Sequence, residues 1–290
     1  MKEVETTMIK PTGIILLALA TAVTHAEPNA YEKELREQHK GYLTESTVDS
    51  ALILPPPPAE GSVTKANDEF VNKNAFMLYG SDRWVQAGYD SNLYLPSAAK
   101  AFSCAANVDI SKEKTPTIYK MLETSLVDLG LSTYTAKNKY QRVRPFISNG
   151  QGICEISAAD REKFGITYEE NKEKLATDGS YPSGHSAIGW GWALIMSEIA
   201  PQRANHIFLR GRAFAESRLV CNVHWQSDII EGKNMAAMTV AQLHTQKQFL
   251  KDLAKAQKEY QTAQRKGDVP DPASCEFENK ALSTTVGSVM

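Results

Sequence analysis

Apolar residues at helical spacing constrain this chain more than any other feature. One set of large apolar side chains recurs three and four positions apart, at Ile118, Met121, Leu122, Leu126 and Leu129. A second set with the same spacing follows Ser183, at Ile188, Trp192, Ile195 and Ile199. This spacing is typical of a buried helix face, and no stretch alternates apolar and polar residues as a strand does. The sequence therefore predicts an all-α fold, a single-domain helical bundle whose facing helices donate the site residues.

Helix-breaking residues divide this pattern into segments. Gly130 interrupts the first periodic helix, and the pattern then resumes as far as Arg144, where Pro145 predicts a stop. Two later helices are expected, one over residues 202–218 and one from about residue 224 to residue 264. Residues 146–179 are rich in polar and turn-forming residues and are expected to form a surface connection.

The N-terminus has the layout of a secretory signal peptide. Its apolar run, residues 13–20, is shorter than the ~18 residues of a membrane span and leads to a predicted cleavage after Ala26. Because Glu3 and Glu5 dilute the positive charge that normally precedes such a run, Met8 is the better candidate for the true start. Residues 1–26 are therefore expected to direct export to the periplasm or the medium, and no later stretch is apolar for long enough to insert stably in a membrane.

The mature chain then divides into three parts. Residues 27–58 form a polar N-terminal arm that ends in four consecutive prolines, which impose extended geometry. Residues 59–264 carry the helical domain. Residues 265–290 show little periodicity and are expected to be a loosely ordered tail unless Cys275 fastens it to the domain.

Cysteines and net charge limit the function classes. The four cysteines allow two disulfides in an oxidising compartment, and three pairings stay open: they are Cys104, Cys154, Cys221 and Cys275. No CxxC pattern indicates structural zinc. Cys221 could act as a thiol nucleophile, although a structural role is favoured. A net charge of -2 argues against a general nucleic-acid binder, so any anion binding must be local.

The segment Pro182-Ser183-Gly184-His185 begins the second periodic helix. Ser183 is a good N-cap, and Gly184 allows a ligand to approach the backbone closely. The free N–H groups and the positive end of the helix dipole favour an anion there. His185 is then expected in the first turn beside the bound group.

A second histidine is paired with a carboxylate. His224 and Asp228 are four residues apart, so on a helix the carboxylate lies beside the imidazole. A carboxylate that accepts from one ring nitrogen leaves the other as a lone-pair nucleophile. The remaining histidines form no metal-ligand set with this pair, so no metal site is predicted.

Three cations complete the constellation. Lys137 and Arg144 are seven residues apart, two helical turns, and are predicted to project from one helix face. Arg218 precedes His224 by six residues, which would separate them on a straight helix. A helix end or turn near Cys221 and Asn222 would bring them together, so that the guanidinium could hold two phosphate oxygens while His224 attacks.

These three groups together resemble the signature of the type 2 phosphatidic acid phosphatase superfamily. The matching residues, in chain order, are Lys137-x6-Arg144-Pro145, Pro182-Ser183-Gly184-His185 and Ser217-Arg218-x5-His224-x3-Asp228. The run of prolines after Leu54 and the sequence His224-Trp225-Gln226-Ser227-Asp228 are similar to the secreted class A bacterial non-specific acid phosphatases. The resemblance spans roughly residues 52–264.

The resemblance implies a fold and a mechanism. It implies an all-α acid phosphatase that hydrolyses small phosphomonoesters without a cofactor and that has neither nucleic acid nor a membrane as a partner. His224 would form a phosphohistidine with Asp228 orienting it, and His185 would protonate the leaving alcohol. The phosphate oxygens would be held by Lys137, Arg144, Ser183, Gly184 and Arg218. The resemblance also suggests a homo-oligomer and phosphotransfer to alcohols.

One alternative of a different reaction class belongs to the same superfamily. A vanadate-dependent haloperoxidase would use the same site residues, because vanadate adopts the trigonal-bipyramidal geometry of a phosphoryl transition state. Nothing in the sequence favours this alternative.

Overall fold

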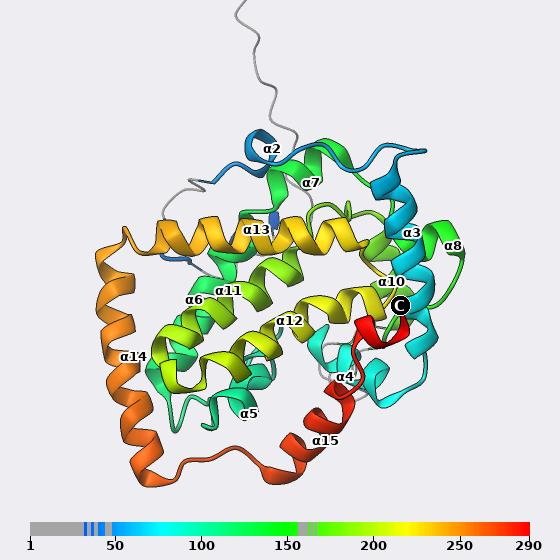
Figure 1. The fold of residues 1–290 in the computed structure, drawn as a ribbon. Coiled ribbons are helices and arrows are strands. Elements are labelled where there is room, and N and C mark those ends of the chain that lie inside the picture. The colour runs from blue at the N-terminus through cyan, green and yellow to red at the C-terminus, as the bar shows by residue number, and fades with distance from the viewer. Residues whose placement is uncertain are drawn as a thin grey trace, which may run out of the picture.

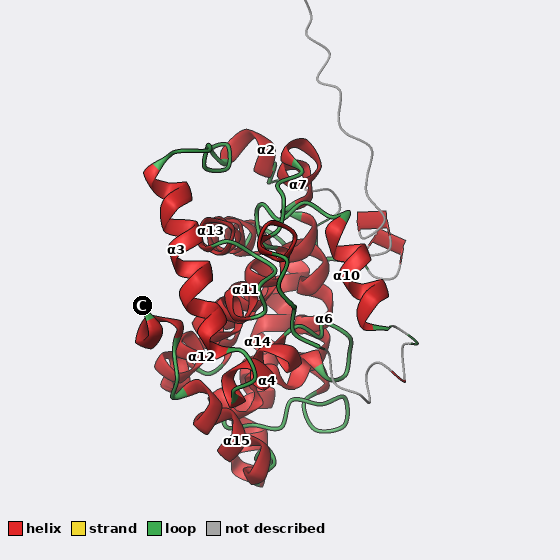
Figure 2. Cartoon of the chain, turned by 90° about the vertical axis from the view of Figure 1, so that its right-hand side faces the viewer, coloured by secondary structure: helices red, strands yellow, loops and turns green. Residues whose placement is uncertain are grey.

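The fold is a bundle of α-helices that is described here from a computed structural model, which places residues 32–33, 36–37, 40–43, 48–155, 162, 165 and 167–290. Within these residues there is no β-strand, and Figure 2 shows helices and loops only. The predicted signal peptide, residues 1–26, lies outside the described residues. The all-α prediction is confirmed.

The helices differ widely in length. In chain order they are α2 (Ser50–Ile53), α3 (Val63–Ala75), α4 (Asp82–Asp90), α5 (Ser103–Ala106), α6 (Pro116–Leu131), α7 (Tyr134–Tyr140), α8 (Pro145–Asn149), α10 (Tyr168–Ala176), α11 (Gly184–Ile199), α12 (Ala204–Val220), α13 (Gln226–Leu243), α14 (Lys247–Lys266) and α15 (Pro272–Leu282). Short 3-10 turns, η1 (Phe76–Leu78), η2 (Ala98–Phe102), η3 (Pro201–Arg203) and η4 (Val286–Val289), join or follow some of them.

Helix α11 is the centre of the bundle. It packs against α6, α12, α13 and α14, and Figure 1 shows α13 running above α11 and α12, with α14 along the left side. Trp192 in the middle of α11 is fully buried, and its indole Nε1 donates to the carbonyl of Leu122 on α6 at 3.0 Å. A helix that is apolar on several faces must be buried on several sides. This burial fixes the position of the α11 N-terminus, where the site residues lie.

The segment around Lys137 and Arg144 differs from the prediction. Helix α7 ends at Tyr140, and Gln141 adopts a left-handed conformation with φ 43°. Pro145 does not stop a helix but occupies the first position of α8, where its missing N–H costs no hydrogen bond. The prediction that Lys137 and Arg144 share one helix face is therefore wrong. They approach each other because the chain between α7 and α8 folds back, with Ser180 N donating to Arg142 O at 2.9 Å.

The predicted single helix from residue 224 to residue 264 is two helices. Helix α13 ends at Leu243, and α14 begins at Lys247 in a new direction, which Figure 1 shows. The backbone of Gln246 is extended, with ψ 119°, which interrupts the helical hydrogen bonds. The apolar periodicity continues through the break because both helices bury one face in the same core, which includes Leu243, Phe249 and Leu253.

The C-terminal tail is ordered and not loose. It forms α15 and η4, and the disulfide between Cys104 and Cys275 fastens it to the start of α5. Glu278 reaches the buried Arg210 on α12, with Oε2 at 2.9 Å from Nε. The sequence predicts a loose tail unless Cys275 fastens it to the domain, and Cys275 does fasten it. A cross-link over such a long separation restricts the unfolded chain strongly.

The N-terminal arm lies on the bundle. The backbone N–H groups of Tyr42 and Leu43 donate to the carboxylate of Asp128 on α6, at 2.8 and 3.1 Å. The first proline of the proline run is tied down as well, since the Tyr181 hydroxyl donates to Pro55 O at 2.8 Å. Burial raises the pKa of Asp128 to about 6, although the two backbone donors oppose this shift. The proline run is thus a rigid segment laid on the domain.

Gly232 on α13 allows the closest approach to the α11 N-terminus. A Cβ at this position would lie 2.4 Å from the carbonyl oxygen of Ser183, a backbone atom that cannot rotate away. Helix α13 and the site segment can touch at this point only because residue 232 has no side chain.

We therefore expect Gly232→Ala to lower the free energy of unfolding by about 1–3 kcal/mol through overpacking. Asn234→Ala, at an exposed position of the same helix, is the control and should change stability by less than about 0.5 kcal/mol. Urea unfolding followed by circular dichroism measures both. Equal midpoints for Gly232→Ala and the wild type would contradict the close-approach argument.

Candidate active site

The predicted site residues surround one cavity of about 550 Å³. We call it the site cavity. Six of the eight predicted residues line it: Lys137, Arg144, Gly184, His185, Arg218 and His224. The other two, Ser183 and Asp228, are fully buried behind this lining. The structure thus brings the three sequence groups together, although they lie on separate elements.

His224 sits just beyond the end of α12, as the sequence required. The helix ends at Val220, and Asn222 turns the chain with a φ of 60°, a conformation that asparagine tolerates better than most residues. The backbone N–H of His224 then donates to the carbonyl of Arg218 at 3.3 Å. The predicted turn near Cys221 and Asn222 is confirmed, and it places Arg218 and His224 at the same cavity.

The Asn222 turn is held by a buried amide cluster. Its Oδ1 accepts from Asn72 Nδ2 and Asn149 Nδ2, both at 2.9 Å. Its Nδ2 donates to Gly152 O and to Asn149 Oδ1, both at 3.1 Å. Because both ends of the amide are satisfied from several elements, the turn before His224 has one preferred geometry.

A disulfide reinforces the same turn from the other side. Cys221 is bonded to Cys154, with their Cα atoms 4.7 Å apart, and both residues line the site cavity. This pairing, with that of Cys104 and Cys275, resolves the three pairings that the sequence left open. It also excludes Cys221 as a free thiol nucleophile.

Asp228 orients the imidazole of His224. Its Oδ2 lies 3.4 Å from His224 Nδ1 and accepts from the backbone N–H of Trp225 at 2.8 Å. Since a carboxylate only accepts, Nδ1 carries the ring proton and Nε2 keeps its lone pair. That nitrogen is 3.1 Å from Arg144 Nη1, which can donate to it. His224 Nε2 is therefore the ring nitrogen with nucleophilic character.

Arg142 is a site residue that the sequence reasoning missed. Its Nη1 donates to Asp228 Oδ1 at 2.6 Å, and its Nη2 donates to Asp68 Oδ2 at 2.7 Å. Asp68 in turn accepts from the hydroxyl and the backbone N–H of Ser227. Arg142 does not line the site cavity, and it holds the carboxylate that orients His224. Its position two residues before Arg144 gave no spacing signal, because its partners come from α3 and α13.

The two upstream cations meet at one carboxylate. Asp178 Oδ2 lies 2.9 Å from Arg144 Nη2 and 3.4 Å from Lys137 Nζ. Lys137 Nζ also donates to Gly179 O at 2.5 Å. Burial lowers the pKa of Lys137 to about 8, while the negative charge of Asp178 opposes that shift. Asp178 was not among the predicted residues, since an isolated aspartate in a polar connection carries no pattern.

His185 occupies the first turn of α11, as predicted. Its Nε2 lies 3.0 Å from the carbonyl oxygen of Ser91. Because a carbonyl only accepts, Nε2 carries a proton, and Nδ1 is the nitrogen that can exchange a proton within the cavity. Ser183 caps the helix, its Oγ accepting from Ser186 N at 3.2 Å. The Ser183 hydroxyl thus serves the helix end, and Gly184 is the residue that reaches the cavity.

Two polypeptide segments form the outer walls of the cavity. Residues 91–95, which follow α4, contribute an apolar wall together with Leu126 and Ile188. Helix α10 contributes polar side chains opposite, Glu170, Asn171 and Lys174.

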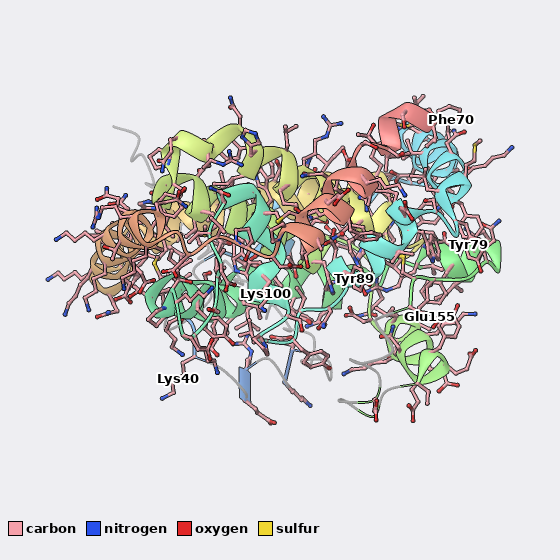
Figure 3. The ribbon with its side chains drawn as sticks, turned by 90° about the horizontal axis from the view of Figure 1, so that it is seen from below. Lys40, Phe70, Tyr79, Tyr89, Lys100 and Glu155 are labelled. Atoms are coloured by element: carbon pink, nitrogen blue, oxygen red, sulfur yellow. A yellow bond between two sulfur atoms is a disulfide. The ribbon has the colours of Figure 1, made fainter. Side chains whose placement is uncertain are left out.

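The Ile153 segment separates the site cavity from a second groove. This groove has a volume of about 320 Å³ and is lined by Tyr79, Tyr89 and Glu155, among others. Figure 3 labels these three side chains on the view from below. Ile153 lines both spaces. The chain at Ile153 therefore divides the two spaces, and it is held by the Tyr168 hydroxyl, which accepts from Ile153 N at 3.1 Å, and by the disulfide of Cys154.

Burial and neighbouring positive charges disfavour the protonated forms of both histidines of the site. Burial lowers the pKa of His224 well below 6.5, and the charges of Arg144, Lys137 and Arg218 lower it further. Burial and the charge of Arg218 do the same to the pKa of His185. A bound phosphate would oppose both effects, because its negative charge favours the protonated rings.

These shifts predict how stability depends on pH. Below about pH 6.5 the histidines of the unfolded chain bind protons more readily than the buried histidines of the folded chain. The free energy of unfolding therefore falls as pH is lowered. We expect His185→Gln to reduce this loss by up to about 1.4 kcal/mol per pH unit. The measurement is urea unfolding between about pH 7 and pH 5.

The exposed His206 provides the matched control for this experiment. His206→Gln should keep the pH dependence of the wild type, because it removes an exposed side chain and leaves the buried histidines unchanged. If the wild type and His185→Gln lose stability in parallel on acidification, the neutral buried state of His185 is refuted.

Comparison with known proteins agrees with this arrangement. The profile of the PAP2 superfamily matches residues 121–252. The chain is 38% identical over 221 residues to a non-specific acid phosphatase of Providencia stuartii, covering 76% of this chain and 84% of that protein. It is 37% identical over 237 residues to an acid phosphatase of Zymomonas mobilis, covering 80% and 83%. A non-specific acid phosphatase of Salmonella typhimurium is 35% identical over 216 residues, covering 74% and 81%. The chain therefore belongs to the PAP2 superfamily, alongside its bacterial non-specific acid phosphatases.

Proposed function

We propose that this protein is an acid phosphatase that hydrolyses small phosphomonoesters through a phosphohistidine at His224, without a metal. One observation carries the proposal. His224 Nε2, oriented through Nδ1 by a buried carboxylate, faces the same cavity as three cations and a second histidine. Phosphoryl transfer needs this combination, because the charge on three equatorial oxygens must be stabilised while a nucleophile attacks in line. In the described residues, no three acidic, histidine or cysteine side chains gather as metal ligands.

The first chemical step forms the intermediate. The lone pair of His224 Nε2 attacks phosphorus, and the bond from phosphorus to the ester oxygen breaks. The proton on His185 Nδ1 passes to that oxygen, so the alcohol leaves neutral. Arg144 Nη1 must move from His224 Nε2 toward a phosphate oxygen for this attack. The donors Lys137, Arg218 and Gly184 N–H are then placed for the transferring group.

The second step regenerates the enzyme. Neutral His185 takes a proton from water through Nδ1, the water oxygen attacks phosphorus, and the bond to His224 Nε2 breaks. Inorganic phosphate remains in the cavity. An alcohol in place of water would give phosphotransfer by the same step. Activity needs His185 protonated and His224 neutral, so the pH profile should be bell-shaped. The lowered pKa of His185 places its protonated form at acid pH, and bound phosphate counteracts that shift.

We also propose that the protein is exported to the periplasm or the medium. The N-terminal signal layout and the two disulfides support export to an oxidising compartment. In the described part of the chain, none of the helices is both long and apolar enough to cross a bilayer. Homo-oligomerisation stays a prediction from the family resemblance.

The nucleophile is tested by acid-quenched labelling with a phosphomonoester that carries a labelled phosphate. We expect the wild type to trap one label per chain and His224→Ala to trap none. In His185→Ala we expect the labelled enzyme to accumulate or to form more slowly. Turnover of an aryl phosphate should persist in excess chelator and fall by at least about 10³-fold in His224→Ala.

Three outcomes would contradict the proposed function. One is a label that survives His224→Ala, and another is complete loss of turnover on chelation. The third is halide oxidation by peroxide that requires added vanadate and exceeds phosphatase turnover, which would favour the haloperoxidase.

Arg142 provides a second prediction for the same mechanism. Arg142→Gln removes the charge that holds Asp228, and we expect kcat to fall about 10- to 100-fold with little change in KM, as for other residues that position a reacting group through a ligand. Arg212→Gln, which breaks only an exposed ion pair with Glu216, is the control and should leave both constants unchanged. If Arg142→Gln folds and keeps the wild-type kcat, Arg142 has no part in orienting His224.

A further inference from the structure

The carboxylate of Asp178 stands where a bound anion would contact the upstream cations. We propose that it is an internal anion that competes with phosphate for Lys137 and Arg144, and so limits how tightly the enzyme holds its product. The proposal rests on the proposed function, because it concerns the same phosphate site.

The contacts of Asp178 are those of an anion at this site. Its Oδ2 lies 2.9 Å from Arg144 Nη2 and 3.4 Å from Lys137 Nζ. The residue is 8% exposed and lines the site cavity with both cations. A buried carboxylate between two cations interacts with them far more strongly than a surface pair does. Phosphate oxygens and Asp178 Oδ2 would therefore accept hydrogen bonds from the same donors, Lys137 and Arg144.

The donors of Arg144 make this competition explicit. Its Nε donates to Asp178 O at 2.8 Å, and its Nη1 contacts Val223 O at 2.9 Å and His224 Nε2 at 3.1 Å. Its Nη2 contacts Asp178 Oδ2 at 2.9 Å and Gly179 O at 3.5 Å. A guanidinium has five N–H groups, and protein atoms lie within hydrogen-bond distance of all three nitrogens of Arg144. Arg144 can hold phosphate only by giving up part of this set, and Asp178 Oδ2 is its charged member.

The charge balance of the cavity gives this competition a consequence. Among the buried residues of the lining, Lys137, Arg144 and Arg218 bring three positive charges and Asp178 brings one negative charge. Asp228 is compensated separately by Arg142. Without Asp178 the cations would bind a phosphate dianion more tightly, and substrate and product would gain alike. Binding that stabilises ground state and transition state equally does not raise kcat, and tight product binding slows release.

The opposing possibility is that Asp178 only holds the cations in place. The two roles predict opposite signs. If Asp178 competes, its neutralisation tightens phosphate binding. If it is only a scaffold, its neutralisation misplaces Arg144 and weakens phosphate binding.

The experiment is calorimetric titration of the full-length mature protein with inorganic phosphate. We expect Asp178→Asn, which keeps the shape and removes the charge, to lower the Kd for phosphate about 10- to 100-fold, the scale of one unit charge roughly 6–12 Å away at an effective dielectric constant near 20. The product-inhibition constant should fall by the same factor. An unchanged or weaker Kd would overturn the proposal.

Glu170→Gln is the matched control for charge alone. Glu170 lines the same cavity and caps α10, a role that glutamine can also fill. It is exposed and should change the Kd by less than about 2-fold, because solvent screens it. A Kd that tightens equally in Glu170→Gln and Asp178→Asn would overturn the direct competition, since it would point to the net charge of the cavity.

A second neutral variant keeps the test decisive. Asp178→Ser leaves room for water and should tighten phosphate binding in the same direction, with a larger phosphate-induced rise in Tm than the wild type shows. If neither neutral variant unfolds cooperatively, the carboxylate is a structural requirement and the proposal fails. Because the titration needs no turnover, an inactive wild type whose Asp178→Asn variant binds phosphate more tightly would refute the proposed function and leave this inference standing.

Discussion

The buried carboxylate of Asp228 is the interaction on which the site depends. One oxygen faces His224 Nδ1 and the Trp225 backbone, and the other accepts from Arg142. The backbone carbonyl of Asp228 accepts from Ser183 N at 3.0 Å. A single residue thus ties together the chain before α8, the start of α11 and the start of α13. Breaking a buried pair of this kind leaves an uncompensated charge, which is why these three segments hold one geometry.

Burial gives the site its chemical character. The same desolvation that lowers the pKa of both histidines also strengthens every contact between the charges of the cavity. Arg144 is central to this balance, because it contacts Nε2 of His224 and the carboxylate of Asp178 at once. These internal partners must be replaced when phosphate binds, so part of the affinity for the ligand offsets contacts already made.

Stabilising elements surround the site at its most irregular points. The turn at Asn222 has a positive φ, and an amide cluster and the Cys154–Cys221 disulfide hold it from two sides. The tail is fastened by Cys104–Cys275, and Glu278 joins the Arg210–Asp90 pair next to Ser91, the residue whose carbonyl fixes His185. Irregular backbone near a reacting group persists when its surroundings determine it fully.

The sequence by itself determined the helical class, the three signature groups and the need for a turn before His224, because apolar spacing, N-cap chemistry and helix periodicity are local properties of the chain. Only the tertiary structure decided how Lys137 and Arg144 meet, where the last helix breaks, which cysteines pair, and that Arg142 and Asp178 belong to the site. Those features depend on contacts between residues far apart in the chain, and a charged side chain shows no pattern that reveals its partner. Local signals fix elements and candidate groups, whereas the geometry of charge pairs arises only when the elements pack.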